Sequence, residues 1–373
     1  MNVVLFAGGK SGEHEISLVS CAAVARAISG CHQVHLITIS KSGRWYLEEA
    51  SVLEELRSNP AATLSVHEDA AAEVKVSFGL GKDKAFFARG SYIPCDVAFA
   101  VLHGTYGEDG TIQGVFEMAG VPYAGCGVLS SSVAMDKESA KLVLQSAGLP
   151  VVPFVCIRRC DAVHLDEALA GAADKLGFPL FVKPCAAGSS DGASRATNRE
   201  ELAAAAAEAF TWDDKILVEK AIDAREIECS VTGCSVTEEA GSPCTQVRAY
   251  GPGEIVPTHG FYDYDAKYTD PDGALLQVPA RLPPDVIATI RTLAAKAYRA
   301  ISASGLSRVD FFVDKGTGEV YLNEINTMPG FTSISMFPKL CAAEGLDFTQ
   351  LVDLLLEQAV ATFATKAHLR TQR

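Results

Sequence analysis

The stretch from Arg308 to Met336 constrains the fold most, because it predicts a β-hairpin followed at once by a Gly- and Ser-rich loop. In a strand, alternate side chains point to the same face. On the first strand, one face would carry Arg308, Asp310 and Phe312, and the other would carry Val309, Phe311 and Val313. On the second strand, a shared face would carry Leu322, Glu324 and Asn326. The hairpin therefore presents acidic side chains on both strands.

The turn of this hairpin predicts which residues face each other. A three-residue turn at 316–318 would pair Lys315 with Glu319, and counting back pairs Asp310 with Glu324 and Arg308 with Asn326. Opposed carboxylates repel unless a cation lies between them. Such oxygen ligands suit a hard ion such as Mg²⁺. The alternative is an edge hairpin with a solvated, charged face.

Composition excludes some classes of protein. The chain has 373 residues, of which 48% are hydrophobic and 21% charged, as expected for two or three globular domains. Its net charge of −14 disfavours nucleic acid as a partner, although a local basic pocket for a phosphorylated ligand remains compatible. There is no apolar run of about 18 residues and no basic segment ahead of the first strand. We expect a cytoplasmic protein that does not enter a membrane.

The cysteines predict no disulfide framework or zinc site. The chain has 11, scattered through apolar stretches and without a CxxC pair. Cys156 and Cys160 are four apart but have no nearby histidine cluster. We expect reduced and mostly buried thiols.

The N-terminal part predicts an α/β domain. An apolar strand at 2–7, a glycine turn at 8–13 and a helix at 16–28 open the chain. The turn is not a P-loop, because Val4 stands where that motif needs glycine. Residues 41–93 are expected to form peripheral strands and loops. A second apolar strand at 97–102 ends at His103, where α/β proteins place ligands, so His103 is either a functional or a core histidine.

The middle of the chain carries a candidate phosphate loop. An apolar strand at 179–182 leads to Lys183 and then to the loop 188–192, whose free N–H groups could close over phosphate oxygens. Many tight turns have the same composition. Residues 261–269 are aromatic, acidic and basic in close succession, which is typical of a loop that orders over a ligand or packs its tyrosines on the surface.

Taken in order, these segments resemble the D-alanine:D-alanine ligases of the ATP-grasp superfamily. Seven stretches carry the resemblance: GGKSGEHEIS (8–17), HGTYGEDGTIQG (103–114), MDK (135–137), VKP with GSSDG (182–192), REIE (225–228), FYDYDAKY (261–268), and RVDFF with NEINTMPGFTSIS (308–335). The resemblance implies a three-domain ATP-grasp architecture of α/β and α+β type. Its expected domains are a Rossmann-like N-terminal domain (1–125), a central ATP-grasp subdomain (126–218) and a C-terminal domain (219–373).

The resemblance also implies the reaction. The carboxylate of one D-alanine would attack the γ-phosphate of ATP, and the amine of a second D-alanine would displace phosphate from the acyl phosphate. It implies two Mg²⁺ or Mn²⁺ ions and a homodimer. Phosphoryl transfer mainly requires neutralised charge and in-line positioning, which metals and lysines supply.

Site residues carry over position by position. The implied metal ligands are Asp310, Glu324 and Asn326. The implied ATP-binding residues are Lys137, Lys183, Ser190, Glu219, Lys220, Ala221, Ile222, Glu226 and Lys267. The implied catalytic residues are Glu13, Ser189, Tyr268, Arg308, Gly330 and Ser335. The implied substrate-binding residues are Glu13, His103, Lys267, Ser335 and Met336.

One position bears on substrate specificity, and another bears on the candidate phosphate loop. Tyr268 accompanies dipeptide makers in this resemblance, so we expect D-alanine as the second substrate, with D-serine or D-lactate as alternatives. Asp191 departs from the aliphatic residue usual in GSSxG, and its charge is unfavourable in a loop that covers phosphates. A nucleotide-binding regulator that has lost catalysis is a third hypothesis, and the intact acidic hairpin argues against it.

Overall fold

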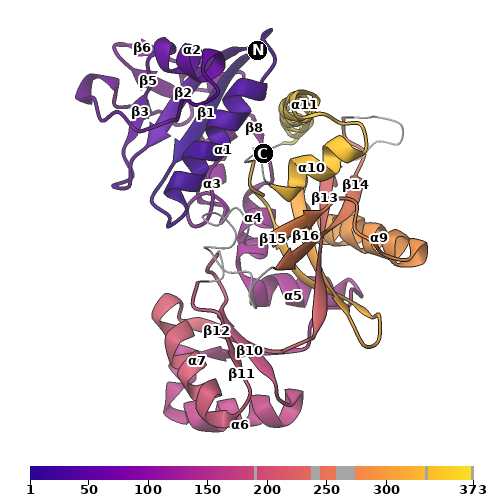
Figure 1. Cartoon of the computed structure of the whole chain (residues 1–373). Helices are drawn as coiled ribbons and strands as arrows, with labels where there is room; N and C mark the ends of the chain where they lie inside the picture. Colours follow the sequence, from indigo (N-terminus) through magenta and orange to yellow (C-terminus); the bar gives the residue numbers. More distant parts are fainter. Residues whose placement is uncertain (189–190, 237–243, 258–273, 332–334, 371–373) are drawn as a thin grey trace.

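Three larger β-sheets follow one another along the chain (Figure 1). They are seen in a computed structural model that describes residues 1–188, 191–236, 244–257, 274–331 and 335–370. The first sheet is mainly parallel, whereas the second and third are antiparallel. This confirms the expected combination of α/β and α+β parts.

The N-terminal sheet has the strand order β3-β2-β1-β7-β8. Its strands are β1 (Asn2–Gly8), β2 (Gln33–Ile39), β3 (Trp45–Leu47), β7 (Val97–Ala100) and β8 (Tyr123–Ala124). Its helices are α1 (His14–Ala27), α2 (Ala50–Ser58) and α3 (Thr111–Ala119). Residues 3–7 of β1 are fully buried, because the central strand of a parallel sheet is covered on both faces. The predicted strand–turn–helix opening is confirmed.

Residues 41–93 contain one element that the sequence did not predict. Helix α2 lies in this region, where Val52, Leu53 and Leu56 recur at helical spacing and pack on the N-terminal core, although only Leu56 is fully buried. The rest of the region holds a small sheet and short 3₁₀ turns, as expected for a periphery: β4 (Lys75–Val76), β5 (Phe86–Ala88), β6 (Ser91–Tyr92), η1 (Ala70–Ala72) and η2 (Lys82–Lys84).

The central sheet has the order β11-β10-β12-β9. Its elements are β9 (Phe154–Arg158), η3 (Arg159–His164), α6 (Leu165–Leu176), β10 (Leu180–Pro184), β11 (Ser194–Ala196), α7 (Arg199–Trp212) and β12 (Lys215–Lys220). Asn198 caps α7 by accepting a hydrogen bond from the N–H of Glu201 at 2.9 Å. Both helices contribute to a hydrophobic core that belongs to this sheet alone.

The C-terminal sheet has the order β15-β14-β13-β16-β17. Its strands are β13 (Ala224–Cys234), β14 (Arg248–Pro257), β15 (Ala274–Gln277), β16 (Ser304–Asp314) and β17 (Val320–Asn326). The accompanying helices are α9 (Pro284–Ala300), α10 (Met336–Ala343) and α11 (Phe348–Lys366). Two earlier helices, α4 (Val128–Met135) and α5 (Lys137–Ser146), pack against β17.

The hairpin β16–β17 confirms the key pairing and corrects the turn. Asp310 pairs with Glu324, and Arg308 pairs with Asn326, as predicted. The turn is one residue longer than expected, because the N–H of Asp314, not Lys315, donates to the carbonyl of Glu319. A β-bulge next to Asp310 restores the register.

The bulge also changes which face Leu322 occupies. The sequence placed Leu322 on the face of Glu324 and Asn326, but it is fully buried and shares a core cluster with Ile325. Asn323 is the extra residue, since Phe311 pairs with Leu322 and Asp310 with Glu324. A bulge reverses the alternation on one side of it, which a strict period of two cannot anticipate.

One hydrophobic core joins the first and last parts of the chain. Buried residues of β1 and β7 share a cluster with Phe331, Phe337 and Leu355, and α11 contacts α1 and β7. Figure 1 shows α11 (yellow) lying beside the indigo N-terminal elements, with the central sheet set apart below. The predicted domain boundaries remain predictions.

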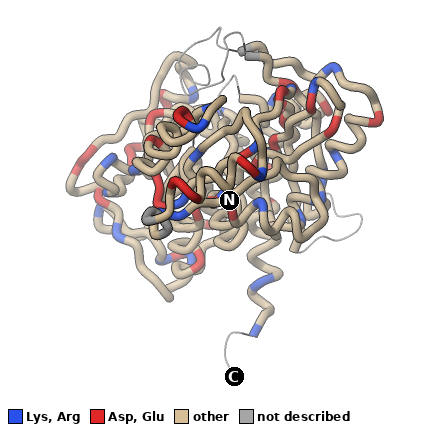
Figure 2. The backbone as a smooth tube through the Cα atoms, turned by 90° about the horizontal axis from the view of Figure 1, so that it is seen from below, with Lys and Arg blue, Asp and Glu red and all other residues tan. Residues whose placement is uncertain are grey.

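Further features concern the chain as a whole. All 11 cysteines are free thiols and most of them are buried. Within the described residues, no helix is both long and apolar enough to span a bilayer. Figure 2 shows acidic (red) and basic (blue) residues scattered along the backbone tube.

Candidate active site

A cleft of about 650 Å³ gathers residues from all three sheets. It is lined by every predicted site residue that the structure describes: Glu13, His103, Lys137, Lys183, Glu219, Lys220, Ala221, Ile222, Glu226, Arg308, Asp310, Glu324, Asn326, Gly330, Ser335 and Met336. Four predicted residues lie outside the described ranges: Ser189, Ser190, Lys267 and Tyr268. Residues as far apart in sequence as Glu13 and Lys339 thus share one cavity.

The hairpin forms a wall rich in carboxylates. Arg308 grips Asp310 with two parallel hydrogen bonds, Nε to Oδ1 at 2.8 Å and Nη2 to Oδ2 at 2.7 Å. Its Nε also lies 3.2 Å from Oε1 of Glu228, which is on the neighbouring strand β13. Burial disfavours the charge of Arg308, but Asp310 and Glu228 outweigh it and raise its pKa well above the ordinary value. One guanidinium therefore serves two carboxylates, and Glu324 stands opposite Asp310.

The oxygen donors of this wall fit a hard divalent cation. Asp310 and Glu324 face each other across the ladder, and Asn326 follows on β17. The side-chain oxygen of Asn326 accepts a hydrogen bond from the N–H of Met328 at 3.0 Å, which orients the amide. Two carboxylates and an amide oxygen leave room for the phosphate and water ligands that Mg²⁺ retains. The predicted metal ligands therefore suit Mg²⁺ or Mn²⁺ in chemistry and register.

The opposite wall is rich in lysines. The Glu219 carboxylate lies 2.7 Å from Nζ of Lys141 and 2.8 Å from Nζ of Lys183, and all three side chains are at least 90% buried. Burial would raise the pKa of Glu219, but the two lysines lower it. Burial lowers the pKa of Lys141, whereas for Lys183 the carboxylates of Glu219 and Glu324 overcome burial and raise the pKa.

Two further contacts tie this wall to its surroundings. Nζ of Lys183 donates to Oδ1 of Asn323 at 3.2 Å, so the bulged residue of the hairpin contacts the lysine wall. Lys137 opens α5, and its Nζ donates to the carbonyl of Ala187 at 2.6 Å, just before the candidate phosphate loop. Burial lowers the pKa of Lys137.

In the segment after β12, some backbone N–H groups are already hydrogen-bonded within the protein. The N–H of Lys220 donates to the carbonyl of Pro153, and the N–H of Ala221 donates to that of Pro179, both at 3.0 Å. These two groups are therefore engaged within the protein, although both residues line the cleft with Ile222 and Glu226.

Acidic groups and a histidine meet at the N-terminal end of the cleft. Glu13, His103 and Glu108 bring one ligand atom each within 4.8 Å of one another. Burial, followed by the charge of Glu13, raises the pKa of Glu108 well above its usual value. A Cβ added to Gly188 would lie 3.0 Å from Oε1 of Glu13, so the candidate phosphate loop approaches this carboxylate closely. Glycine permits that approach.

His103 is buried and hydrogen-bonded on both ring nitrogens. Nδ1 lies 3.0 Å from the carbonyl oxygen of Met328, and Nε2 lies 3.0 Å from Oγ of Ser20. Burial lowers the pKa of His103, which keeps the ring neutral.

The loop after the hairpin brings Gly330 close to Ser335. A Cβ on Gly330 would lie 2.9 Å from Oγ of Ser335, which precedes α10. Both residues and Met336 line the cleft, as predicted. Asp191 also lines it, and its N–H donates to the carbonyl of Gly188 at 3.0 Å.

The sequence reading did not assign several residues of the site. Lys141 is one helical turn after Lys137 on α5, a spacing that places both on one face. Glu228 follows Glu226 by two, which is the spacing of one strand face. Those spacings could have indicated both residues. By contrast, nothing in the sequence marks Asn323 as the bulged residue.

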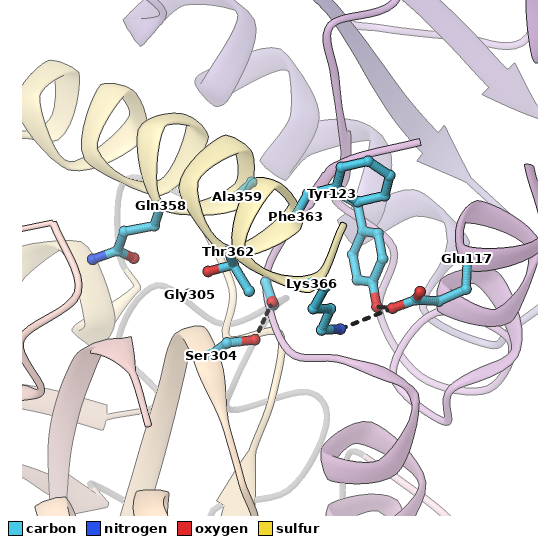
Figure 3. A pocket seen from close by; sticks show the side chains of 10 residues that line it. Glu117, Tyr123, Ser304, Gly305, Gln358, Ala359, Thr362, Phe363 and Lys366 are labelled. Carbon is cyan, nitrogen blue, oxygen red and sulfur yellow. Dashed lines mark hydrogen bonds and ion pairs between the residues drawn. The ribbon is translucent and has the colours of Figure 1, made fainter. Parts of the chain in front are cut away.

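A second, much smaller cavity lies away from this cleft, between α11, β8 and the start of β16 (Figure 3). There, Oε1 of Glu117 accepts hydrogen bonds from Oη of Tyr123 at 2.8 Å and from Nζ of Lys366 at 3.1 Å. Its volume of about 20 Å³ has room for about one water molecule. We assign it no ligand.

Comparison with known proteins agrees with the fold and the cleft. The family profile described as D-ala D-ala ligase N-terminus matches residues 2–126, and that described as D-ala D-ala ligase C-terminus matches residues 143–357. A D-alanine–D-alanine ligase of Treponema denticola is 51% identical over 376 residues, covering 100% of both chains. A ligase of the same description from Heliobacterium modesticaldum is 43% identical and covers 100% of this chain and 98% of its own.

Solved structures give the same result. The D-alanine-D-alanine ligase from Coxiella burnetii superposes with a TM-score of 0.83 at 32% identity, covering 98% of this chain and 96% of that one. The VanG D-Ala:D-Ser ligase from Enterococcus faecalis superposes with a TM-score of 0.80 at 35% identity, covering 96% of this chain and 100% of that one.

Three sheets around a cleft with a lysine wall and a carboxylate wall therefore define an ATP-grasp enzyme. More specifically, the chain belongs to the D-alanine–D-alanine ligase family, whose profiles and relatives span nearly its whole length. Membership of this family makes the chain a ligase of peptidoglycan synthesis.

Proposed function

We propose that the chain uses ATP to join two D-alanines through an acyl phosphate. The observation that carries the proposal is the pairing, in one cleft, of a wall with surplus lysines and a wall with surplus carboxylates. A polyphosphate with divalent cations is complementary to both walls at once. The first D-alanine carboxylate would be phosphorylated between them, and the amine of the second would then attack the acyl carbon.

The lysine wall would hold the nucleotide. Lys137 and Lys183 would contact phosphate oxygens, with Ser190 covering them. The segment Glu219–Ile222 would contact the adenine, and Glu226 the ribose. Because the N–H groups of Lys220 and Ala221 already donate to backbone carbonyls and Glu219 is paired with Phe181 in the sheet, we propose that adenine recognition uses the N–H of Ile222.

The carboxylate wall would hold two Mg²⁺ or Mn²⁺ ions through Asp310, Glu324 and Asn326. When bound, the ions neutralise phosphate charge during transfer. Binding would also free Arg308 from part of its pairing with Asp310, so that the guanidinium and the N–H of Gly330 could stabilise the oxyanion of the tetrahedral intermediate.

The remaining roles concern the substrates and closure. Glu13 would pair with the ammonium of the first D-alanine, beside His103, and Ser335 and Lys267 would hold the carboxylate of the second, near Met336. Glu13, Ser189 and Tyr268 would form a hydrogen-bonded triad that closes the site. Closure excludes water, which would otherwise hydrolyse the acyl phosphate.

D-serine is the second candidate acceptor, because the VanG relative is named as a D-Ala:D-Ser ligase and covers nearly the whole chain. D-lactate is a third. An attacking amine must be neutral, whereas a hydroxy acid competes better when the amine is protonated. Product mass with each acceptor across pH distinguishes the three.

We further propose a cytoplasmic homodimer with the three domains 1–125, 126–218 and 219–373. Free, mostly buried thiols support a reducing compartment. The three sheets support the division, although α4 and α5 pack against the third sheet. Light scattering of the purified protein tests the dimer.

The central experiment measures phosphate release from ATP with a panel of D-amino acids. We expect release that requires both D-alanine and Mg²⁺ and that yields the D-alanyl-D-alanine mass. A folded sample with no D-alanine-dependent release would contradict the proposal. ATP binding without release would instead favour the nucleotide-binding regulator.

A further inference from the structure

A buried serine of the N-terminal helix contacts the loop that follows the metal-binding hairpin. Ser20 lies on α1, has no exposed surface, and is 311 residues before Phe331. Its Oγ lies 3.0 Å from Nε2 of His103 and accepts a hydrogen bond from the N–H of Phe331 at 3.4 Å. None of the roles given above uses this serine.

The partners fix the direction of each hydrogen bond. The Met328 carbonyl can only accept, so Nδ1 of His103 must carry the hydrogen that is donated to it. Nε2 of the neutral ring is then an acceptor, and Ser20 donates its hydroxyl hydrogen to it. The oxygen of Ser20 remains an acceptor for the N–H of Phe331. All three groups are satisfied only with this tautomer and a neutral ring.

These bonds attach the loop on both sides of Gly330. His103 binds it at Met328, two residues before Gly330, and Ser20 binds it at Phe331, one residue after. The same loop is tied to the metal wall, because Asn326 accepts from the N–H of Met328. The N-terminal sheet and the carboxylate wall therefore fix the direction of the Gly330 N–H together.

We propose that Ser20 and His103 are positioning residues that hold the loop 328–331 so that the Gly330 N–H is aimed at the reacting centre. This rests on the proposed role of Gly330 in binding the oxyanion. It assigns His103 to the protein's own loop, not to direct contact with a substrate, because both ring nitrogens are already bonded. An oxyanion donor must be correctly placed before the charge develops.

The chain offers a matched control for Ser20. Ser17 lies one turn earlier on α1 and is equally buried. Its Oγ donates to the carbonyl of Val101 and accepts from the N–H of Gly8 at 2.8 Å. These partners belong to the N-terminal unit, so S17A removes comparable bonds without touching the loop.

The test compares S20A, S17A, H103N and S20A/H103N in phosphate release. Asparagine can place an amide N–H near the position of Nδ1, so H103N keeps the bond to Met328 and loses the one to Ser20. We expect S20A to lower kcat by about 10- to 100-fold, because a small displacement of a group that contacts the reacting atoms slows the reaction by about that much. The KM for ATP should change little. We expect the double variant to match S20A, because S20A already breaks the only bond that H103N removes.

Three results would overturn the proposal: S20A no slower than S17A, losses that multiply in the double variant, or an Nε2-protonated His103 in the nitrogen NMR spectrum. If S20A does not fold, H103N and the NMR tautomer still decide. An inactive unaltered enzyme would refute the proposed function instead, so the two failures are distinguishable.

Discussion

The two walls of the cleft have opposite charge balances, and the side chains of both are largely buried. On the lysine wall, proposed to hold the nucleotide, Lys137, Lys141 and Lys183 stand against Glu219, which is three cations to one anion. Their excess charge is retained in a low-dielectric setting, where an unpaired charge is costly. Burial accordingly lowers the pKa of Lys137 and Lys141.

The hairpin side is the inverse. Glu228, Asp310 and Glu324 stand against Arg308, which is three anions to one cation. Neither wall is balanced alone, and each lacks what a metal-bound polyphosphate provides. This difference indicates that the cleft is suited to a ligand that carries both signs of charge. Arg308 and Glu219 are the counter-charges that the protein itself supplies.

Removing one anion from the hairpin should have the largest effect. We expect E324Q to lower turnover by about 100-fold or more, because the hairpin loses one of the carboxylates proposed to bind metal. Folding should be intact, since a repulsion with Asp310 is removed as well. Turnover by coupled phosphate assay and unfolding by calorimetry check both parts.

E319Q is the matched control, because Glu319 lies exposed at the turn of the same hairpin. It should leave turnover unchanged. If E324Q were as active as E319Q, Glu324 would not be a metal ligand. The proposed contrast in charge between the two walls would then lose its anionic side.

Replacing the counter-charge of the hairpin wall comes next. Arg308→Lys keeps the charge but loses the two-pronged grip on Asp310. We expect kcat to fall by about 100-fold with a smaller change in the KM for ATP. Equal changes in both constants would mean that Arg308 belongs to ground-state binding instead.

A smaller effect is expected behind the lysine wall. K141M leaves Glu219 with Lys183 alone, so Lys183 is held more tightly by the carboxylate and less available to phosphate. We expect the KM for ATP to rise about 10-fold, or about 1.4 kcal/mol. The exposed K175M on α6 should not change it. An unchanged KM for ATP in K141M would mean that Lys141 contributes only to the stability of the fold.

The smallest effect concerns pH. Burial lowers the pKa of His103 in the folded state, partly opposed by Glu13, so the unfolded chain binds a proton more readily below its usual pKa of about 6.5. Stability from this group is therefore complete above that pH and is lost as pH falls through the lowered pKa. Denaturation at several pH values should give a shallower acid dependence for H103N. Equal slopes would contradict the shift.

Much of the fold could be predicted because its signals are local. The strands at 2–7 and 97–102 follow from apolar runs, and the first sheet buries them as expected. Helix α2 was missed although Val52, Leu53 and Leu56 recur at helical spacing, because the charged segment around it was interpreted as strands and loops. The bulge at Asn323 was missed because it depends on pairing with β16.

The sequence by itself determined the chemistry of the site: acidic residues on a hairpin, lysines beside glycine loops, and motifs that resemble one ligase family. Residue type and short-range spacing are enough for this, because they act within one strand or turn. Only the tertiary structure decided which groups neutralise each other. Arg308 meets Glu228 across strands, Lys141 and Lys183 converge on Glu219, and Ser20 reaches Phe331 across 311 residues. Such contacts arise from packing separate elements around shared cores, and spacing along the chain does not encode them.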